Sequence, residues 1–197
     1  MEAGNVKERK TLQLVLGINA VMFFCEGIVG LLAQSAGLVA DSLDMFADAS
    51  VYAIGLYAVG KSAGLKTASA KCSGFAQIML ALLVSGEVLK RFFHGSEPDS
   101  GLMMGMGVIA LLANIACLRL ISKHRDGGAH MRASLIFSTN DVIANGGVIL
   151  SGILVWLLHS RQPDLFIGLV IAFVVLRGGI QILREASANA CNGRIQS

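Results

Sequence analysis

Six apolar stretches of about twenty residues each constrain the fold of this sequence more than any other feature. A helix of that length crosses the hydrocarbon core of a bilayer, which is roughly 30 Å thick. Continuous apolar runs favour helices over strands, because backbone groups in lipid must bond within their own segment. The expected spans are residues 11–33, 38–60, 72–93, 101–121, 133–158 and 165–185. The sequence therefore predicts an all-α membrane protein, with a single transmembrane domain over residues 1–197 and no separate soluble domain.

The composition excludes several classes of function. Of the 197 residues, 54% are hydrophobic and 15% are charged, whereas a typical soluble domain has about 25% charged residues. The net charge of +3 comes from loop lysines and arginines without a basic patch, so we expect no nucleic-acid partner. No HExxH or GxSxG motif occurs in any span, so we expect neither an enzyme nor a bound cofactor.

The distribution of lysine and arginine predicts the orientation. One side of the predicted bundle carries Lys7, Arg9, Lys10, Lys61, Lys66, Lys71, Lys123, Arg125, Arg132, Arg184 and Arg194. The opposite side carries Lys90, Arg91 and Arg161, together with the acidic Glu97 and Asp99. Basic residues collect on the cytoplasmic side of a membrane, so both termini are expected to be cytoplasmic.

Three aspartates lie within the second span, where charged side chains are costly. At 100° per residue, Asp41, Asp44 and Asp48 fall on one stripe of a helix. A single buried aspartate usually bonds to a neighbouring helix. Three like charges on one stripe repel one another in a low dielectric, so protons or a cation must neutralise them. The stripe therefore indicates an ion site.

The fifth span supplies a fourth acidic residue at a matching depth. Asp48 and Asp141 each lie roughly 15 Å from an end of their spans, which run in opposite directions. Both carboxylates therefore reach the centre of the bilayer. Gly146 and Gly147 allow a neighbouring helix to approach closely. Oxygen ligands from two helices at one level are typical of a cation site.

Other polar residues in the spans have several interpretations. Glu26 lies at about the depth of Asp41, and the two either line an exit pathway or bond to each other. Gln77 is expected to form an interhelical hydrogen bond. Glu87 and Arg177 lie near span ends and are expected to extend toward the membrane surface.

These motifs resemble the transmembrane domain of the cation diffusion facilitator family. Its second helix carries Asp-x-x-[His/Asp]-x-x-x-Asp, which Asp41, Asp44 and Asp48 match, and its fifth helix ends a similar motif in an aspartate matched by Asp141. The resemblance implies a six-helix exporter of Zn2+ or a related metal in exchange for protons. It also implies Asp44, Asp48 and Asp141 as metal ligands, a homodimer, and a bacterial inner membrane as the location.

The sequence departs from the family pattern at Phe137, where the family places His or Asp four residues before Asp141. Water or a neutral side-chain oxygen is then expected to complete the site. The candidate oxygen donors are Ser138, Asn140 and Asn145.

The predicted function is alternating-access efflux of a divalent transition metal, Zn2+ first, with protons exchanged for metal at the carboxylates. An all-oxygen site without histidine is harder than the usual zinc site, so Mn2+, Co2+ and Cd2+ are alternatives. A further alternative is a non-transporting membrane partner subunit. The family's cytoplasmic C-terminal domain, which commonly supports dimerisation and metal sensing, does not follow the last predicted span.

Overall fold

The computed structural model of the chain describes residues 2–58, 63–123 and 129–195, and over these ranges it contains helices and no strand. The all-α prediction is therefore confirmed for the described residues. The helices are α1 (Glu2–Leu32), α2 (Ala36–Ala58), α3 (Ala63–His94), α4 (Ser100–Ser122), α5 (Ala129–Leu158) and α6 (Gln162–Ile195).

Three helices extend far beyond the predicted spans. Helix α1 begins at Glu2, well before the predicted start at residue 11. The region from Lys61 to Lys71 was expected to be a break, but α3 begins at Ala63 and includes Lys66 and Lys71. Similarly, α6 continues to Ile195, beyond the predicted end at residue 185. Helices α3 and α6 pack against each other more extensively than any other described pair. Their extensions are polar, so the apolar pattern used to draw the spans could not reveal them.

Four helices contain segments long and apolar enough to cross a bilayer: Arg9–Leu32, Ser100–Ser122, Asp141–Leu158 and Gln162–Arg184. The described parts of α2 and α3 fall outside this set, and α2 carries three aspartates along its length. Large apolar side chains such as Phe24, Leu83 and Trp156 lie on the outside of the bundle. A surface of this kind is suited to lipid, and the protein is an integral membrane protein.

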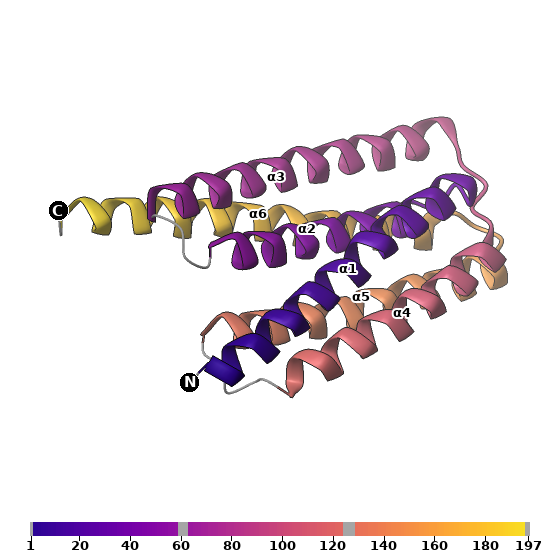
Figure 1. Cartoon of the computed structure of the whole chain (residues 1–197). Coiled ribbons are helices and arrows are strands. Elements are labelled where there is room, and N and C mark those ends of the chain that lie inside the picture. The colour runs from indigo at the N-terminus through magenta and orange to yellow at the C-terminus, as the bar shows by residue number, and fades with distance from the viewer. Residues whose placement is uncertain (1, 59–62, 124–128, 196–197) are drawn as a thin grey trace.

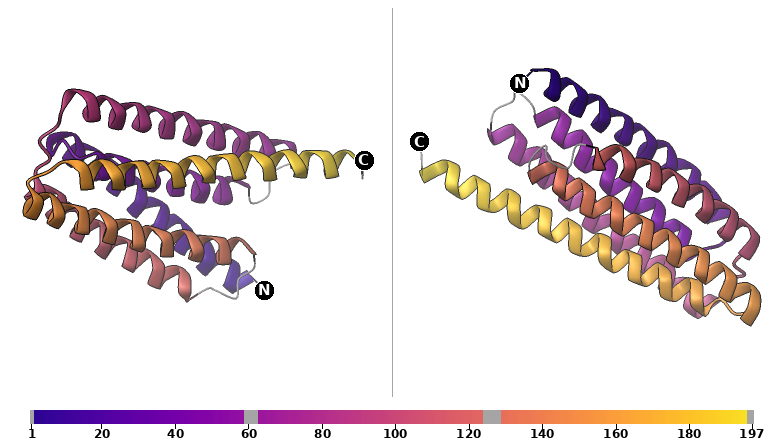
Figure 2. Two further views of the ribbon diagram at one scale, coloured as in Figure 1. Left: turned by 180° about the vertical axis from the view of Figure 1, so that it is seen from behind. Right: turned by 90° about the horizontal axis from the view of Figure 1, so that it is seen from below.

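The helices pack as three close pairs: α3 with α6, α1 with α2, and α4 with α5 (Figure 2). Glycines permit the closest approach between α3 and α6. A Cβ atom added at Gly74 would lie 3.0 Å from the carbonyl oxygen of Gly179, and one added at Gly179 would lie 3.0 Å from that of Gly74. The two backbones therefore touch at this level, and a larger residue at either position would push them apart.

Hydrogen bonds join the helices at the end of the bundle where α2 and α6 begin. The carboxylate of Asp164 accepts hydrogen bonds from the Ser35 hydroxyl at 2.6 Å and from the backbone N–H groups of Ala36 at 2.6 Å and Gly37 at 2.9 Å. Gly168 lies against Ala36, because a Cβ added there would be 2.9 Å from the Ala36 carbonyl carbon. The first turns of α2 and α6 are thus fixed at the same level.

The opposite end of the bundle is more open. Helices α2, α3 and α6 diverge there from α1, α4 and α5, and both chain ends lie at this end (Figure 1). An even number of spans requires the ends to share a side, as the sequence predicted. Which side faces the cytoplasm remains a prediction from the lysines and arginines.

Candidate metal site

Helix α2 carries the aspartate stripe into the interior of the protein. Asp41 and Asp48 are buried, with 1% and 6% of their surface exposed, and Asp44 is partly buried. Their spacing of three and four residues places them on successive turns of one helix face. The expected stripe therefore points inward, and lipid does not reach it.

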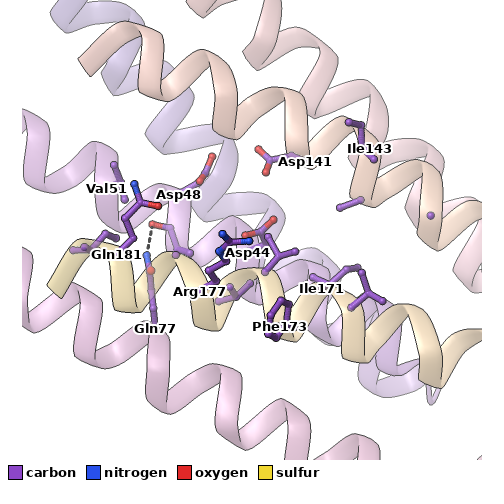
Figure 3. A pocket seen from close by; sticks show the side chains of 18 of the residues that line it. Asp44, Asp48, Val51, Gln77, Asp141, Ile143, Ile171, Phe173, Arg177 and Gln181 are labelled. Carbon is purple, nitrogen blue, oxygen red and sulfur yellow. Dashed lines mark hydrogen bonds between the residues drawn. The ribbon is translucent and has the colours of Figure 1, made fainter. Parts of the chain in front are cut away.

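Asp44, Asp48 and Asp141 line one cavity of about 520 Å³ between α2, α3, α5 and α6. Asp48 and Asp141 point toward each other from opposite sides of it (Figure 3). The carboxyl group of Asp141 interacts with those of both Asp44 and Asp48. Most of the remaining lining is apolar, including Ile171 and Val174. A low-dielectric wall strengthens every electrostatic interaction inside the cavity.

Two hydrogen bonds hold the α2 part of this cavity in place. The Tyr52 hydroxyl, one turn further along α2, donates to Oδ2 of Asp48 at 3.2 Å. The side-chain amide of Gln77 on α3 donates to the backbone carbonyl of Ala47 at 3.1 Å, as the dashed line in Figure 3 marks. Gln77 is buried, so the expectation of an interhelical hydrogen bond is confirmed. This bond fixes α3 against α2 beside Asp48.

The aspartates do not form a closed coordination shell. Among the residues that the structure describes, no three His, Cys, Asp or Glu side chains are grouped so as to hold one ion. Like charges repel one another in a low dielectric, so contacts between these carboxyl groups are favourable only where a proton or a cation is shared. A divalent ion would have to draw the three side chains together from the walls of a wide cavity.

The predicted neutral donors are only partly described. The side chains of Phe137, Ser138 and Asn140 lie outside the described residues, although the backbone there is helical. Asn145 is buried and donates from Nδ2 to the backbone carbonyl of Asp141 at 2.9 Å. Its Oδ1 atom has no hydrogen-bond partner in the described part of the chain, but Asn145 does not line the cavity.

Glu26 and Asp41 form a separate acidic pair between α1 and α2. Both are fully buried, and their carboxyl groups interact with each other. Neither oxygen of Glu26 receives a hydrogen bond from a conventional donor of the described residues. Neither residue lines the cavity that contains Asp44 and Asp48. The two face each other outside that cavity, and both interpretations offered by the sequence, an exit pathway and a mutual bond, stay predictions.

The sequence interpretation did not assign three polar residues to this cavity: Gln77, Arg177 and Gln181. Arg177 is exposed and lines the same cavity as the aspartates; that it extends toward the membrane surface stays a prediction. Its level relative to the aspartates follows from counting residues from Asp164, because hydrogen bonds there align α6 with α2. That count needs the level of α6 relative to α2, which the sequence does not contain.

The fold and this acidic cavity define a polytopic membrane protein with ionisable groups gathered at mid-bilayer depth. Residues 12–189 match the cation efflux transmembrane domain, and the chain belongs to this family. The family resemblance seen in the sequence is therefore confirmed.

Curated relatives are similar over nearly the whole of this chain. The zinc transporter ZitB of Yersinia pestis is 24% identical over 200 residues, covering 95% of this chain and 64% of the relative. ZitB of Escherichia coli (strain K12) is 23% identical over 190 residues, covering 90% and 61%. The cadmium, cobalt and zinc/H(+)-K(+) antiporter of Bacillus velezensis is 25% identical over 198 residues, covering 93% and 63%. The chain thus spans about three fifths of the length of these relatives.

Proposed function

We propose that this protein exports a divalent transition-metal cation, Zn2+ first, in exchange for protons by alternating access. The observation that carries the proposal is that Asp44, Asp48 and Asp141 line one cavity. Three carboxylates in a mostly apolar cavity within the membrane are costly unless positive charge accompanies them. A divalent ion and protons are the two forms of positive charge that this site can exchange.

In the proposed cycle, metal and protons are coupled because both neutralise the same carboxylates. Metal binds the ionised carboxylates while the cavity is open to the cytosol. After the helices rock, the cavity opens to the other side, where protons compete for the same oxygens and release the ion. The hydrogen bonds at Asp164 join the start of α6 to the connection between α1 and α2 at one end of the bundle, whereas at the other end α2, α3 and α6 diverge from α1, α4 and α5 (Figure 1). A hinge in this position is suited to rocking.

The choice of metal depends on the donors. Carboxylate oxygens suit Mn2+ and other hard ions, and Zn2+ accepts them alongside nitrogen ligands. The names of the relatives favour zinc, with cadmium and cobalt as further substrates. We therefore place Zn2+ first and keep Mn2+, Co2+ and Cd2+ as alternatives. Further oxygens would come from water, Ser138, Asn140 or Asn145.

Transport by the purified chain in liposomes tests the proposal. We expect external Zn2+ to enter vesicles and a dye inside them to report proton movement in the opposite direction. Asp48→Asn should abolish both signals, because it removes one of the charges that hold the ion. Glu97→Gln is the matched control, since Glu97 is an exposed acid in the connection between α3 and α4. Metal uptake by the Asp48→Asn variant at the parent rate would overturn the proposal.

The competing proposal is a partner subunit that does not transport. It predicts no metal-dependent signal for the chain alone with any ion of the panel. Zn2+, Mn2+, Co2+ and Cd2+ are therefore compared in one series. We also propose a homodimer in a bacterial inner membrane. Mass measurement of the detergent-solubilised chain tests the dimer, and fractionation of expressing cells tests the location.

A further inference from the structure

Arg177 is a basic side chain in an acidic intramembrane cavity. It lies on α6 and lines the cavity together with Asp44, Asp48 and Asp141. Its side chain projects from α6 toward the part of the cavity that contains Asp44 (Figure 3). An arginine within a membrane-spanning segment is costly, so its presence there calls for a function.

The depth of Arg177 follows from the hydrogen bonds that align α2 and α6. Asp164 accepts from the backbone N–H of Ala36, so the two helices begin at one level, and both run toward the same end of the bundle. Asp48 lies twelve residues after Ala36, and Arg177 lies thirteen residues after Asp164. At 1.5 Å per residue these distances are about 18 Å and about 20 Å. The arginine is therefore at the level of the aspartates, with its side chain lining the cavity and also exposed at its edge.

Within the part of the chain that the structure describes, Arg177 has no fixed partner. It forms no ion pair or hydrogen bond with any residue that the structure describes, whereas Arg91 on α3 pairs with Glu87 at 3.1 Å. Its guanidinium group is charged at every physiological pH and sits on a long, flexible stem. It can therefore move within the cavity but cannot lose its charge.

From these observations we infer that Arg177 is a built-in counter-cation of the metal site, which weakens metal binding so that the ion can be released. This inference rests on the proposed function. Three ionised carboxylates and one guanidinium carry a net charge of −2, which one divalent cation neutralises. Without the guanidinium the loaded site would keep a negative charge, and the metal would be held more tightly. The arginine thus sets the affinity of the site without being a ligand.

Metal binding to the purified full chain in detergent tests the inference, with Zn2+ titrated against a chromophoric indicator. Arg177→Gln and Arg177→Met should each lower the Kd for Zn2+ by at least about tenfold, because a unit charge is removed from a poorly screened cavity. Arg177→Lys keeps the charge and should stay within about threefold of the parent. Arg184→Gln is the matched control, since Arg184 is an exposed arginine of α6 that does not line the cavity.

Each outcome supports or overturns the inference. Unchanged or weaker Zn2+ binding by both neutral variants would overturn it and show that Arg177 extends to the headgroups or orients the aspartates. Two neutral variants are used so that failure of one to fold still leaves the other to decide. Asp48→Asn in the same titration separates this inference from the proposed site. If Asp48→Asn binds like the parent, the aspartate site is wrong; if it loses binding while Arg177→Gln is unchanged, only the role of the arginine fails.

Discussion

The carboxylate of Asp164 accepts a 2.6 Å hydrogen bond from the hydroxyl of Ser35, across 129 residues of sequence. The bond joins the start of α6 to the connection between α1 and α2. The same carboxylate accepts from the backbone N–H groups of Ala36 and Gly37, which have no partner within α2 because they lie in its first turn. The side chain of Asp164, in the first turn of α6, thus caps the start of α2. It aligns the two helices, so that Asp48 on α2 and Arg177 on α6 lie at similar levels beside the cavity.

The first prediction concerns this cap. Asp164→Ala leaves two buried N–H groups and a buried hydroxyl without an acceptor, so we expect it to lower the free energy of unfolding by about 3 kcal/mol. Asp164→Asn keeps one acceptor oxygen and should lose roughly half as much. Asp99→Ala is the control, because Asp99 is exposed and caps α4 through a single 2.9 Å bond from Leu102 N–H. Its cost should be about 1 kcal/mol.

Thermal unfolding in detergent, followed by circular dichroism, measures these differences. A loss for Asp164→Ala no greater than that for Asp99→Ala would show that the junction between α2 and α6 does not depend on this carboxylate.

The second prediction concerns the buried pair of Glu26 and Asp41. Two carboxyl groups that face each other without a conventional donor are poorly satisfied. Glu26→Gln supplies an amide donor of the same shape, so we expect it to raise stability by about 1 kcal/mol at neutral pH. Glu26→Ala leaves Asp41 buried beside a cavity and should lower stability. Glu87→Gln is the control, because Glu87 pairs with Lys90 and Arg91 in a more exposed position and should change stability by under about 1 kcal/mol.

The same detergent-unfolding measurement applies to this pair. A fall in stability for Glu26→Gln as large as that for Glu26→Ala would mean that the pair needs its shared proton or a cation, and that an amide cannot replace it.

The third prediction concerns the ligands. Asp44→Ala, Asp48→Ala and Asp141→Ala should each abolish metal transport while leaving a folded, inserted protein, because each removes a charge that holds the ion. Vesicle uptake and size-exclusion profiles measure the two properties side by side. Near-normal transport by any of the three would remove that aspartate from the proposed set.

The sequence predicts the parts of this site that depend on residue spacing within one helix, and it does not predict the parts that depend on how two helices pack. The aspartate stripe of α2 is local, because helix periodicity alone places Asp44 and Asp48 on one face. The approach of Asp141 to Asp48 joins two helices and is not local. It could still be predicted, because each residue lies deep within a long apolar stretch and its depth can be counted from the end of that stretch. That Arg177 lines the same cavity could not be predicted in this way, since the level of α6 is set by Asp164 and the packing of Gly168 on Ala36. Contacts of this kind form between helices and produce no periodic pattern in the sequence.

The helix ends show the same limit. Apolar spans gave all six helices, and the break at Gly95, with φ of 93°, falls where the chain must turn. The polar extensions of α1, α3 and α6 were missed, because they carry no continuous apolar run.

The fourth prediction concerns proton coupling. Transport should accelerate when the receiving side is acidified, because protons displace the metal from the carboxylates there. Acidifying the side from which metal enters should slow uptake for the same reason. Uptake rates across imposed pH gradients, with an ionophore-collapsed gradient as the control, measure both effects. A rate indifferent to the gradient would indicate a uniporter or channel and would rule out exchange.

The last prediction concerns Phe137, which stands one helical turn before Asp141, where the family pattern places His or Asp. An imidazole at this position would add a nitrogen ligand to a site otherwise built from oxygens. We therefore expect Phe137→His to raise the preference for Zn2+ over Mn2+, since Zn2+ favours nitrogen donors more strongly. Phe137→Leu is the matched control, because it changes the packing without adding a ligand.

The same reasoning applies to the neutral oxygens near Asp141. Ser138→Ala or Asn145→Ala should weaken Zn2+ binding less than the loss of an aspartate, because a neutral oxygen attracts the ion less than a charge does. The Oδ1 atom of Asn145 is buried without a partner among the described residues, but Asn145 does not line the cavity, so it would have to reorient in order to bind the ion. Titrations with Zn2+ and Mn2+ decide between a side-chain donor and water. Flat selectivity for Phe137→His, together with parental binding by both neutral-donor variants, would leave three aspartates and water as the complete site.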